Sequence, residues 1–417
     1  MTATPDGPPR ARARRGRART ALVCAAALLG AALPTAARAA GPGRAPQPRT
    51  GACAASPAPA GGEAKQILDI ARQALKDLDL NAVVLRVNRD GREVVTGALG
   101  QSMTDVPATA DMHFRAGSVA IVYLGVVLLQ LVDEGKAGLD DPVSRWVRGV
   151  PHGDRITLRM LGSSTSGLHD YVTDPKFIAA LYADPFRQWT PAQLEAISTA
   201  HPLWYPPGTN WSYSHANFVI LGAALEKISG TPLATLLQQR VTGPAGLADT
   251  RSETTPVIQE PVLHAFDAER GTYEESTFWN PSWTTAPGAV LTTHICDLAR
   301  SAEVIGTGQL LPAKSFATQL DPGTVGLGKA VGDCSATVCL VMSAARHFGL
   351  GVIVENGWIL TNPSFTGYAA VQAYLPAEHL AIAVSTTTGA KSPAGNTSQT
   401  IAHRITAALT PRHALKG

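Results

Sequence analysis

The sequence of 417 residues is short of charge, of cysteine and of long apolar runs. Charged residues make up 16% of it, and the small net charge of +3 owes much to arginines in the first twenty residues. Without that leader the chain is roughly neutral, so nothing draws it to the phosphates of a nucleic acid. With 45% hydrophobic residues, the composition is that of an ordinary globular protein and excludes a disordered chain.

The N-terminus has the order of a secretory signal. Six arginines between Arg10 and Arg19 precede the apolar run Ala21 to Leu33. That run has about 13 residues, too few to span a bilayer. The small residues around Ala37 and Ala39 then offer a cleavage point. We predict a signal peptide over 1–39 and a secreted or cell-envelope protein with no stable membrane span after cleavage. Residues 40–61, rich in Pro, Ala and Gly, predict a flexible linker.

Cysteine usage agrees with export. Besides Cys24 the chain has four cysteines, an even number that suits an oxidising compartment: Cys53, Cys296, Cys334 and Cys339. The last two frame a short loop that a disulfide could close. No paired His or Cys spacing accompanies them, so we expect no metal site and no cofactor.

Periodicity predicts an α/β (α+β) fold. Apolar residues recur at helical spacing after Gly62, two β-branched runs flank Asp90-Gly91, and a long apolar helix starts at Ser118. The C-terminal part alternates as strands at 348–354, 358–361, 368–376 and 380–387, and ends in a helix over 397–410. The expected architecture is an antiparallel sheet from both chain ends, flanked by helices, with a mostly helical inserted domain. The expected bounds are 62–140 and 286–410 for the sheet-and-helix domain and 141–285 for the helical domain.

Several stretches together resemble one family. They are FRAGSVAIVYLGVVLLQLVDEGKAGLDDPV, ITLRMLGSSTSGLHDY, PPGTNWSYSHANFVILGAALEKISG, APGAVLTTHICDLAR and FTGYAAVQAYLP. In this order they resemble the serine DD-carboxypeptidases and class C β-lactamases, and the resemblance covers nearly all of the chain after residue 62. It implies the β-lactamase/transpeptidase-like fold and a serine acyl-enzyme site.

The first family motif, Ser-x-x-Lys, maps onto Ser118-Val119-Ala120-Ile121. The resemblance makes Ser118 the nucleophile and puts Ile121 where the family has the Lys base. Ile has no titratable atom, so it cannot replace that base. Without the resemblance, the preferred interpretation of Ser118 is a simple helix N-cap.

The second motif, Tyr-x-Asn, maps onto Tyr213-Ser214-His215 and gains an imidazole. Residues two apart on an extended segment face the same way, so we expect His215 in the pocket beside Tyr213. There His215 either acts as acid or base or only replaces the hydrogen bonds of the Asn amide.

The third motif, His/Lys-Thr/Ser-Gly, maps onto Thr361-Asn362-Pro363, where all three residues differ. A Pro in place of the Gly removes an N–H and adds bulk beside the substrate. The resemblance also implies an oxyanion hole from the backbone N–H groups of Ser118 and Ser364.

Further residues are candidates for binding substrate: Trp279, Trp283, Thr361, Asn362, His169 and Asp170. The two tryptophans fall where the family walls its cleft, and they either stack on a ligand or pack the loop. Asp170 could orient an imidazole, but the residues alone favour His169-Asp170 as a simple polar loop pair.

Ordinary peptidase or β-lactamase activity is not expected, because loss of a general base costs about 10²–10⁴ in rate. Three hypotheses remain open. In the first, the pocket is repurposed for another reaction using Ser118, Tyr213 and His215. In the second, the protein is a pseudoenzyme that binds peptidoglycan fragments, a β-lactam or a protein. In the third, it is a serine hydrolase with His215 as substitute base. We expect a small-molecule or peptide ligand and a monomer.

Overall fold

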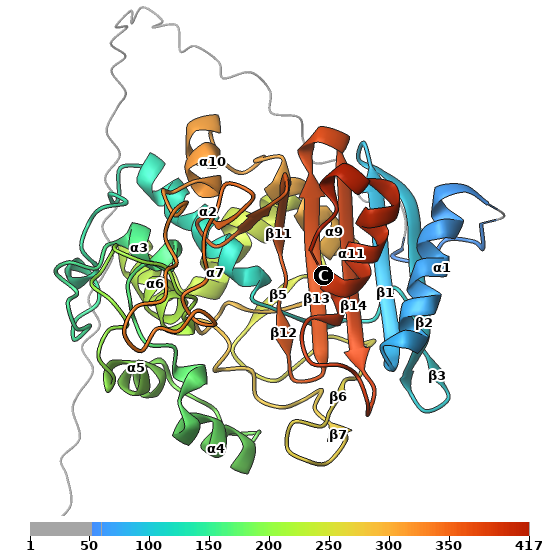
Figure 1. The fold of residues 1–417 in the computed structure, drawn as a ribbon, viewed down its shortest axis with the longest axis horizontal. Helices are drawn as coiled ribbons and strands as arrows, with labels where there is room; N and C mark the ends of the chain where they lie inside the picture. The colour runs from blue at the N-terminus through green and yellow to red at the C-terminus, as the bar shows by residue number, and fades with distance from the viewer. Residues whose placement is uncertain (1–51, 60, 417) are drawn as a thin grey trace, which may run out of the picture. The chain divides into compact units, whose positions relative to one another are not determined.

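The computed structural model describes residues 52–59 and 61–416, which all fall in one compact unit (Figure 1). The expected signal peptide, 1–39, lies outside the described residues, as does the first part of the expected linker. The α/β fold class is confirmed.

Within the described residues the largest sheet has nine antiparallel strands, ordered β3-β2-β1-β14-β13-β11-β10-β9, with β12 also on β13. The strands are β1 Leu80–Arg89, β2 Arg92–Met103, β3 Val106–Pro107, β9 Arg346–Phe348, β10 Ile353–Glu355, β11 Trp358–Thr361, β12 Ser364–Phe365, β13 Tyr368–Leu375 and β14 Leu380–Thr388. Strand β1 pairs with both β2 and β14, so the two chain ends meet in the middle of the sheet.

Two hairpins predicted from their turn residues are present. Asp90 and Gly91 both have positive φ between β1 and β2, as do Asn356 and Gly357 between β10 and β11. Such turns match the right-handed twist of the strands. The strand expected over 348–354 is wrong in part, because Gly351, at φ +74°, lies in a turn that separates β9 from β10.

Helices cover both faces of the sheet. On one face α1 (Gly62–Asp77) and α11 (Thr397–Leu409) pack together, and on the other α9 (Ile295–Gly306) packs on β13, β14 and β1 (Figure 1). The inner residues of α1 include Ile67 and Leu68, which join Ile401 and Ile405 of α11 in one apolar cluster. Helices therefore cover both faces of the sheet, which gives rigid support to the residues at its edge.

Helix α2 (Val119–Asp133) forms the centre of the molecule beside the sheet. It is apolar around its whole circumference and twelve of its fifteen residues are buried. Such a helix must be surrounded by other elements. It packs against α6 (His215–Ser229), which ends where Gly230 adopts a left-handed φ of +70°.

The middle of the chain, 141–285, consists mostly of helices and loops. Besides α6, its α-helices are α3 Leu158–Gly162, α4 Pro175–Ala183, α5 Pro191–Thr199, α7 Leu233–Leu237 and α8 Gly243–Ala245, and α10 follows at Ala313–Leu320. The region also contains strands that were not expected: β5 Arg251–Glu253, β6 Phe266–Asp267 and β7 Glu274–Glu275. Strand β5 joins β8 (Val290–Thr293) and β4 (Phe114–Gly117) in a small sheet, so this insertion is tied to the strand that leads into α2.

Two disulfides are present, Cys53–Cys296 and Cys334–Cys339. The second closes the short loop, as the spacing suggested. The first joins the expected linker to α9, and the Ser56 N–H donates to the Thr96 carbonyl at 2.8 Å. The described end of that linker is therefore fixed to the sheet, which corrects the expectation of a flexible segment up to residue 61.

No single helix within the described residues is long and apolar enough to cross a membrane. The helices over His215–Ser229 and Leu233–Ala245 meet that standard only as a pair bent by 78°.

Candidate active site

Ser118 stands at the junction of β4 and α2. Gly117 has φ +47°, and a Cβ on it would lie 3.1 Å from the Pro363 ring, so a glycine is required here. Ser118 occupies the N-cap position, but its side chain makes no capping bond. Its hydroxyl lies close to the Tyr213 hydroxyl instead. The side chain is thus turned to the cleft, and the simple N-cap interpretation does not describe it.

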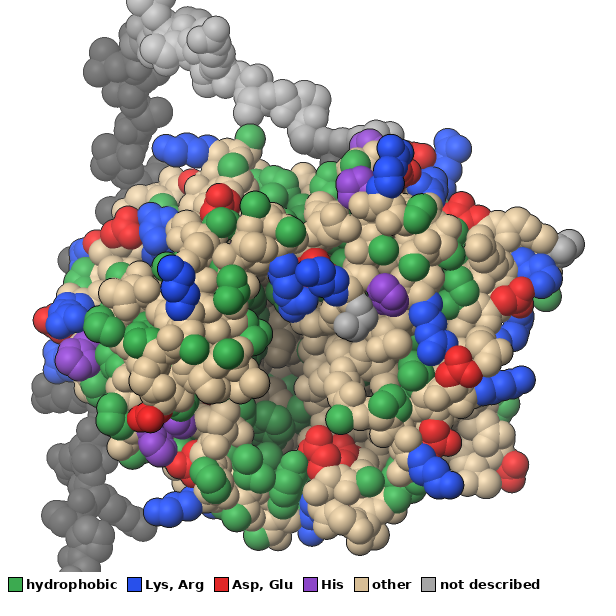
Figure 2. Space-filling view, in the orientation of Figure 1, with side chains coloured by type: hydrophobic (Ala, Val, Ile, Leu, Met, Phe, Trp, Pro, Cys, Tyr) green, Lys and Arg blue, Asp and Glu red, His purple; other side chains and the backbone are tan. Residues whose placement is uncertain are grey.

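Two cavities meet at Ser118, and both are lined by Ser118, His215 and Ser364. The first, about 340 Å³, continues past Ile121, Tyr213 and Asn362. The second, about 600 Å³, continues past Trp283 and Asp267. Figure 2 shows the hollow between the helical part and the sheet, with apolar side chains on its floor. A substrate bound at Ser118 can therefore extend in two directions.

His215 is the first residue of α6 and is held by a buried carboxylate. Its Nδ1 lies 3.1 Å from Oδ1 and 3.0 Å from Oδ2 of Asp170, and its backbone N–H donates to the same Oδ1 at 3.1 Å. Asp170 is only 5% exposed. A carboxylate in this position fixes the proton on Nδ1 and leaves Nε2 as the free basic nitrogen. No described residue forms a hydrogen bond with Nε2. The His215 side chain, which carries this nitrogen, lines both cavities.

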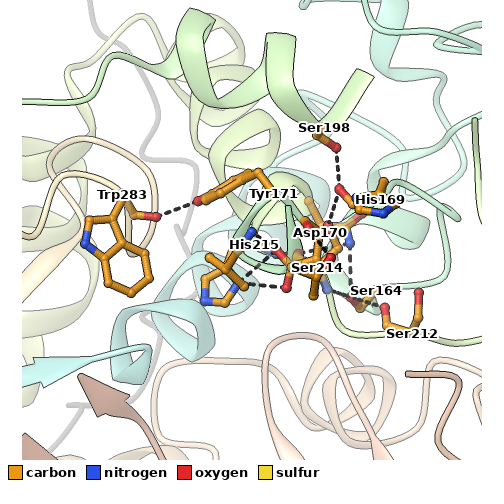
Figure 3. A network of polar contacts seen from close by, with 12 residues as sticks. Ser164, His169, Asp170, Tyr171, Ser198, Ser212, Ser214, His215 and Trp283 are labelled. Carbon is orange, nitrogen blue, oxygen red and sulfur yellow. Dashed lines mark hydrogen bonds and ion pairs between the residues drawn. The ribbon is translucent and has the colours of Figure 1, made fainter. Parts of the chain in front are cut away.

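Ser164 positions the segment that carries His215 (Figure 3). The Ser164 hydroxyl donates to the Ser212 carbonyl at 2.8 Å and accepts from the Ser214 N–H and the Asn217 amide. Ser164 itself has a left-handed φ of +59° and is fully buried. Its three hydrogen bonds fix the start of α6, and with it the direction of the imidazole.

Tyr213 adds a second hydroxyl beside Ser118. Ser214 between Tyr213 and His215 is extended (φ −150°, ψ 126°), so the two flanking side chains point the same way. Their rings meet edge to face with centroids 5.0 Å apart. Burial raises the pKa of Tyr213 well above its usual range, and the nearby Ser118 hydroxyl lowers it only partly. Tyr213 is therefore a neutral phenol close to the Ser118 hydroxyl.

The strand side of the site begins where β11 ends at Thr361. Asn362 and Pro363 interrupt the strand, because Pro offers no N–H for the ladder. The Ala370 N–H donates to the Pro363 carbonyl at 2.9 Å, so the next pair along, Ser364 with Ala369, is of the kind without hydrogen bonds. The Ser364 N–H therefore points away from β13, the direction needed to face an oxygen bound near Ser118.

Comparison with known proteins identifies the family. A profile described as beta-lactamase matches residues 67–405. The chain belongs to the β-lactamase family. Protein Rv1367c of Mycobacterium tuberculosis is 32% identical over 40% of this chain and 44% of that protein. The D-aminopeptidase of Brucella anthropi is 32% identical over 45% of this chain and 36% of that protein. The matches thus span less than half of these relatives.

A solved structure agrees over a longer range. The D-stereospecific amidohydrolase from a Streptomyces species has a TM-score of 0.69 and 26% identity, over 82% of this chain and 98% of that one. The resemblance deduced from the short motifs is therefore confirmed at the level of the family and of its fold.

Most candidate site residues of this family member come together, and two do not. Ser118, Ile121, Tyr213, His215, Thr361, Asn362, Ser364 and Trp283 line one or both cavities, and Asp170 supports His215. His169 lines neither, because its ring stacks between His201 and Trp204. Trp279 lines neither cavity, and is 4% exposed under the Arg270 guanidinium. Both residues pack against neighbouring side chains, and their assignment to substrate binding stays a prediction.

The structure adds wall residues that the motifs did not indicate. Leu340 and Met342 line the first cavity directly after the Cys334–Cys339 loop, and Arg346 lies at the same cavity. The even cysteine count predicted the loop but gave no sign that it borders the site. Asp267 in the second cavity was also missed, since a single Asp before an exposed turn carries no pattern.

One cluster has the residue types of a metal site. Asp249, His294 and Asp297 offer ligand atoms within 4.8 Å of one another. However, His294 caps α9 by accepting the Asp297 N–H, and its Nε2 lies 3.2 Å from Asp249. None of the three lines either cavity. The cluster therefore has a structural account in the capping of α9.

We expect Asp170→Asn to lower turnover of any substrate that this site converts by about 10²-fold or more, the scale for a base that loses its orienting partner. The Asn amide would donate to Nδ1 and move the imidazole proton to Nε2, where a base is needed. Asp184→Asn, in an exposed loop, is the matched control. The comparison is kcat/KM together with the thermal midpoint, and an equal activity for both variants would contradict the role of Asp170.

Proposed function

We propose that the protein is an exported serine hydrolase that cleaves small esters or amides, with Ser118 as nucleophile and His215 as general base. The observation that carries this proposal is the double contact of buried Asp170 with Nδ1 of His215. This contact makes His215, which stands where the second family motif has Asn, an oriented base in a cleft that Ser118 also lines. A residue that served only to replace an amide would not need a buried carboxylate behind it.

The reaction divides into two acyl transfers. Ser118 Oγ attacks the carbonyl carbon while its proton passes to Nε2 of His215, and the carbonyl electron pair moves to the oxygen. The N–H groups of Ser118 and Ser364 stabilise that oxyanion. When the intermediate collapses, the leaving group takes the proton from the imidazolium and departs, leaving an ester on Ser118. Water then attacks this ester with the same proton path and releases the acid.

The other groups serve this path in distinct ways. The carboxylate of Asp170 stabilises the imidazolium that forms on His215. The phenol of Tyr213 keeps the Ser118 hydroxyl oriented. Ile121 provides an apolar wall and no proton acceptor, so the proposed base is His215 and not the residue at the position where the family resemblance places the Lys. The pocket is in this sense repurposed, and no cofactor is needed.

The substrate proposal draws on the relatives. Two proteins similar to this chain are named a D-aminopeptidase and a D-stereospecific amidohydrolase. Esters and amides of D- and L-amino acids are therefore the first candidates. Export is supported by the leader and by two disulfides, which persist in oxidising compartments. We further propose a monomer that binds no nucleic acid.

A second function, binding without turnover, is favoured by one observation. The wall that Ile121 contributes makes the first cavity largely apolar, together with Trp211, Met342 and Phe348. Such a cavity can hold an apolar ligand without any chemistry. In this second function the ligand belongs to the same chemical class as in the hydrolase, but its ester or amide bond is not cleaved.

A panel of amino-acid esters and amides separates the two functions. We expect hydrolysis of activated esters by the purified protein and its loss in Ser118→Ala. Saturable binding with no hydrolysis of any ester, equal in the wild type and Ser118→Ala, would establish the binding function instead.

A further inference from the structure

The second cavity at Ser118 has a distinct chemical character. Its walls are aromatic and aliphatic near the nucleophile, with Phe177, Tyr182 and Trp283 among them. Apart from His215 at the nucleophile, the ionisable side chains that line it are Tyr182, Tyr368 and two carboxylates, Asp267 and Glu269. Among the described residues, no Lys or Arg lines it. The first cavity differs, since no Asp or Glu lines it and Arg346 does.

Asp267 is the buried member of the pair. It lies at the end of β6, is 6% exposed, and accepts the Glu269 N–H at 2.6 Å. Glu269 accepts the Tyr182 hydroxyl at 2.7 Å. Neither carboxylate forms an ion pair with a cationic side chain in the part of the chain that the structure describes. An acid buried without a cation is costly, and a binding site is one setting in which such a group is retained.

We propose that this cavity binds the ammonium group of the substrate, so that the protein acts on amino-acid esters or amides with a free amino group. The inference rests on the proposed hydrolase and specifies its substrate. Asp267 and Glu269 supply the negative charge, and the aromatic rings of Tyr182 and Trp283 supply faces that favour a cation. The scissile carbonyl then lies at Ser118, and the leaving group or side chain extends toward the first cavity.

Two further observations point to a polar ligand in this cavity. Thr366, which lines it, is 8% exposed, and its buried Oγ1 has no hydrogen-bond partner among the described residues. Burial, with the charges of Glu269 and Glu274 adding to it, raises the pKa of Asp267 to about 6. A bound ammonium group would relieve both this repulsion and the desolvation of the carboxylate.

The test compares ligands that differ only in the amine. D- and L-phenylalaninamide and their N-acetyl forms are titrated by calorimetry into Ser118→Ala, which cannot turn them over. We expect the free amines to bind about tenfold to a hundredfold more tightly, the scale of a hydrogen bond to a charged group. Asp267→Asn in that background should remove most of the difference, and Glu269→Gln part of it. Glu274→Gln, which pairs with Arg270 and lines neither cavity, should keep it.

Equal affinity for the free and acetylated amides, or an unchanged difference in Asp267→Asn, would overturn the inference. This result would leave the hydrolase intact if N-acetyl esters are still cleaved by the wild type. Conversely, amine binding that depends on Asp267, without turnover of any ester, would establish the subsite and refute the hydrolase.

Stability gives a readout independent of the ligand. Because the pKa of Asp267 is raised in the folded state, its ionised form destabilises the fold above about pH 6, and this effect vanishes at acid pH where both states are protonated. Asp267→Asn should therefore raise the thermal midpoint at neutral pH and not at pH below about 4. A lowered midpoint at neutral pH would show that Asp267 is a structural acid and overturn its role as a ligand site.

Discussion

His215→Asn should leave the protein folded and lower its kcat/KM for an activated ester by about 10²–10⁴, the range for loss of a general base. Asn is the residue that the family resemblance implies at this position, so its size and hydrogen bonding suit the start of α6. Its amide can donate to Asp170 in place of Nδ1, but no basic nitrogen is left for the Ser118 proton. The measurement is steady-state hydrolysis with the thermal midpoint recorded alongside.

His152→Asn is the matched control for this variant. His152 is exposed, lines neither cavity, and has a left-handed φ of +57° that Asn tolerates. The control should keep full activity. Equal activity of His215→Asn and the wild type would eliminate the imidazole as the base and return the site to ligand binding.

Ile121→Lys is expected to destabilise the protein by about 3 kcal/mol, the scale for an unpaired buried charge, and to bring no gain in turnover. Ile121 is 3% exposed and faces a cavity with no Asp or Glu among its lining residues. An added ammonium group would meet Arg346, His347 and His215 instead. The substitution therefore puts a charge into apolar and basic surroundings.

Chemical denaturation and ester hydrolysis measure this pair of effects. Ile121→Met changes the shape of the side chain without adding charge, so its destabilisation should stay below about 1.5 kcal/mol. Increased turnover in Ile121→Lys at an unchanged free energy of unfolding would show that the site still accommodates the Lys.

Local sequence patterns predicted the helices and strands better than they predicted which strands pair with one another. The Asp90-Gly91 and Asn356-Gly357 turns identified two hairpins, because only a few residue types adopt positive φ. The pairing of β1 with β14 joins residues some three hundred positions apart, and no local pattern contains it. The break at Gly351 was missed for a related reason, since alternation alone does not distinguish one strand from two that fold back on each other.

The sequence motifs predicted only part of the site. Tyr213 and His215 were expected on one face of their segment, and the extended Ser214 between them explains why their side chains point the same way. The partner of Asp170 was not identified, because it depends on how the turn at Tyr171–Thr173 packs against the start of α6. The same turn sends the adjacent His169 to the other side, where it stacks on Trp204.

The most direct test of the central claim is the rate at which Ser118 is acylated. The protein is mixed with an excess of a p-nitrophenyl ester of an amino acid, and quenched samples are analysed by intact mass and peptide mapping. The account predicts one acyl group on Ser118 in the wild type, no adduct in Ser118→Ala, and acylation slowed by about 10²-fold or more in His215→Asn. Acylation of Ser118 at the same rate in His215→Asn as in the wild type would contradict it.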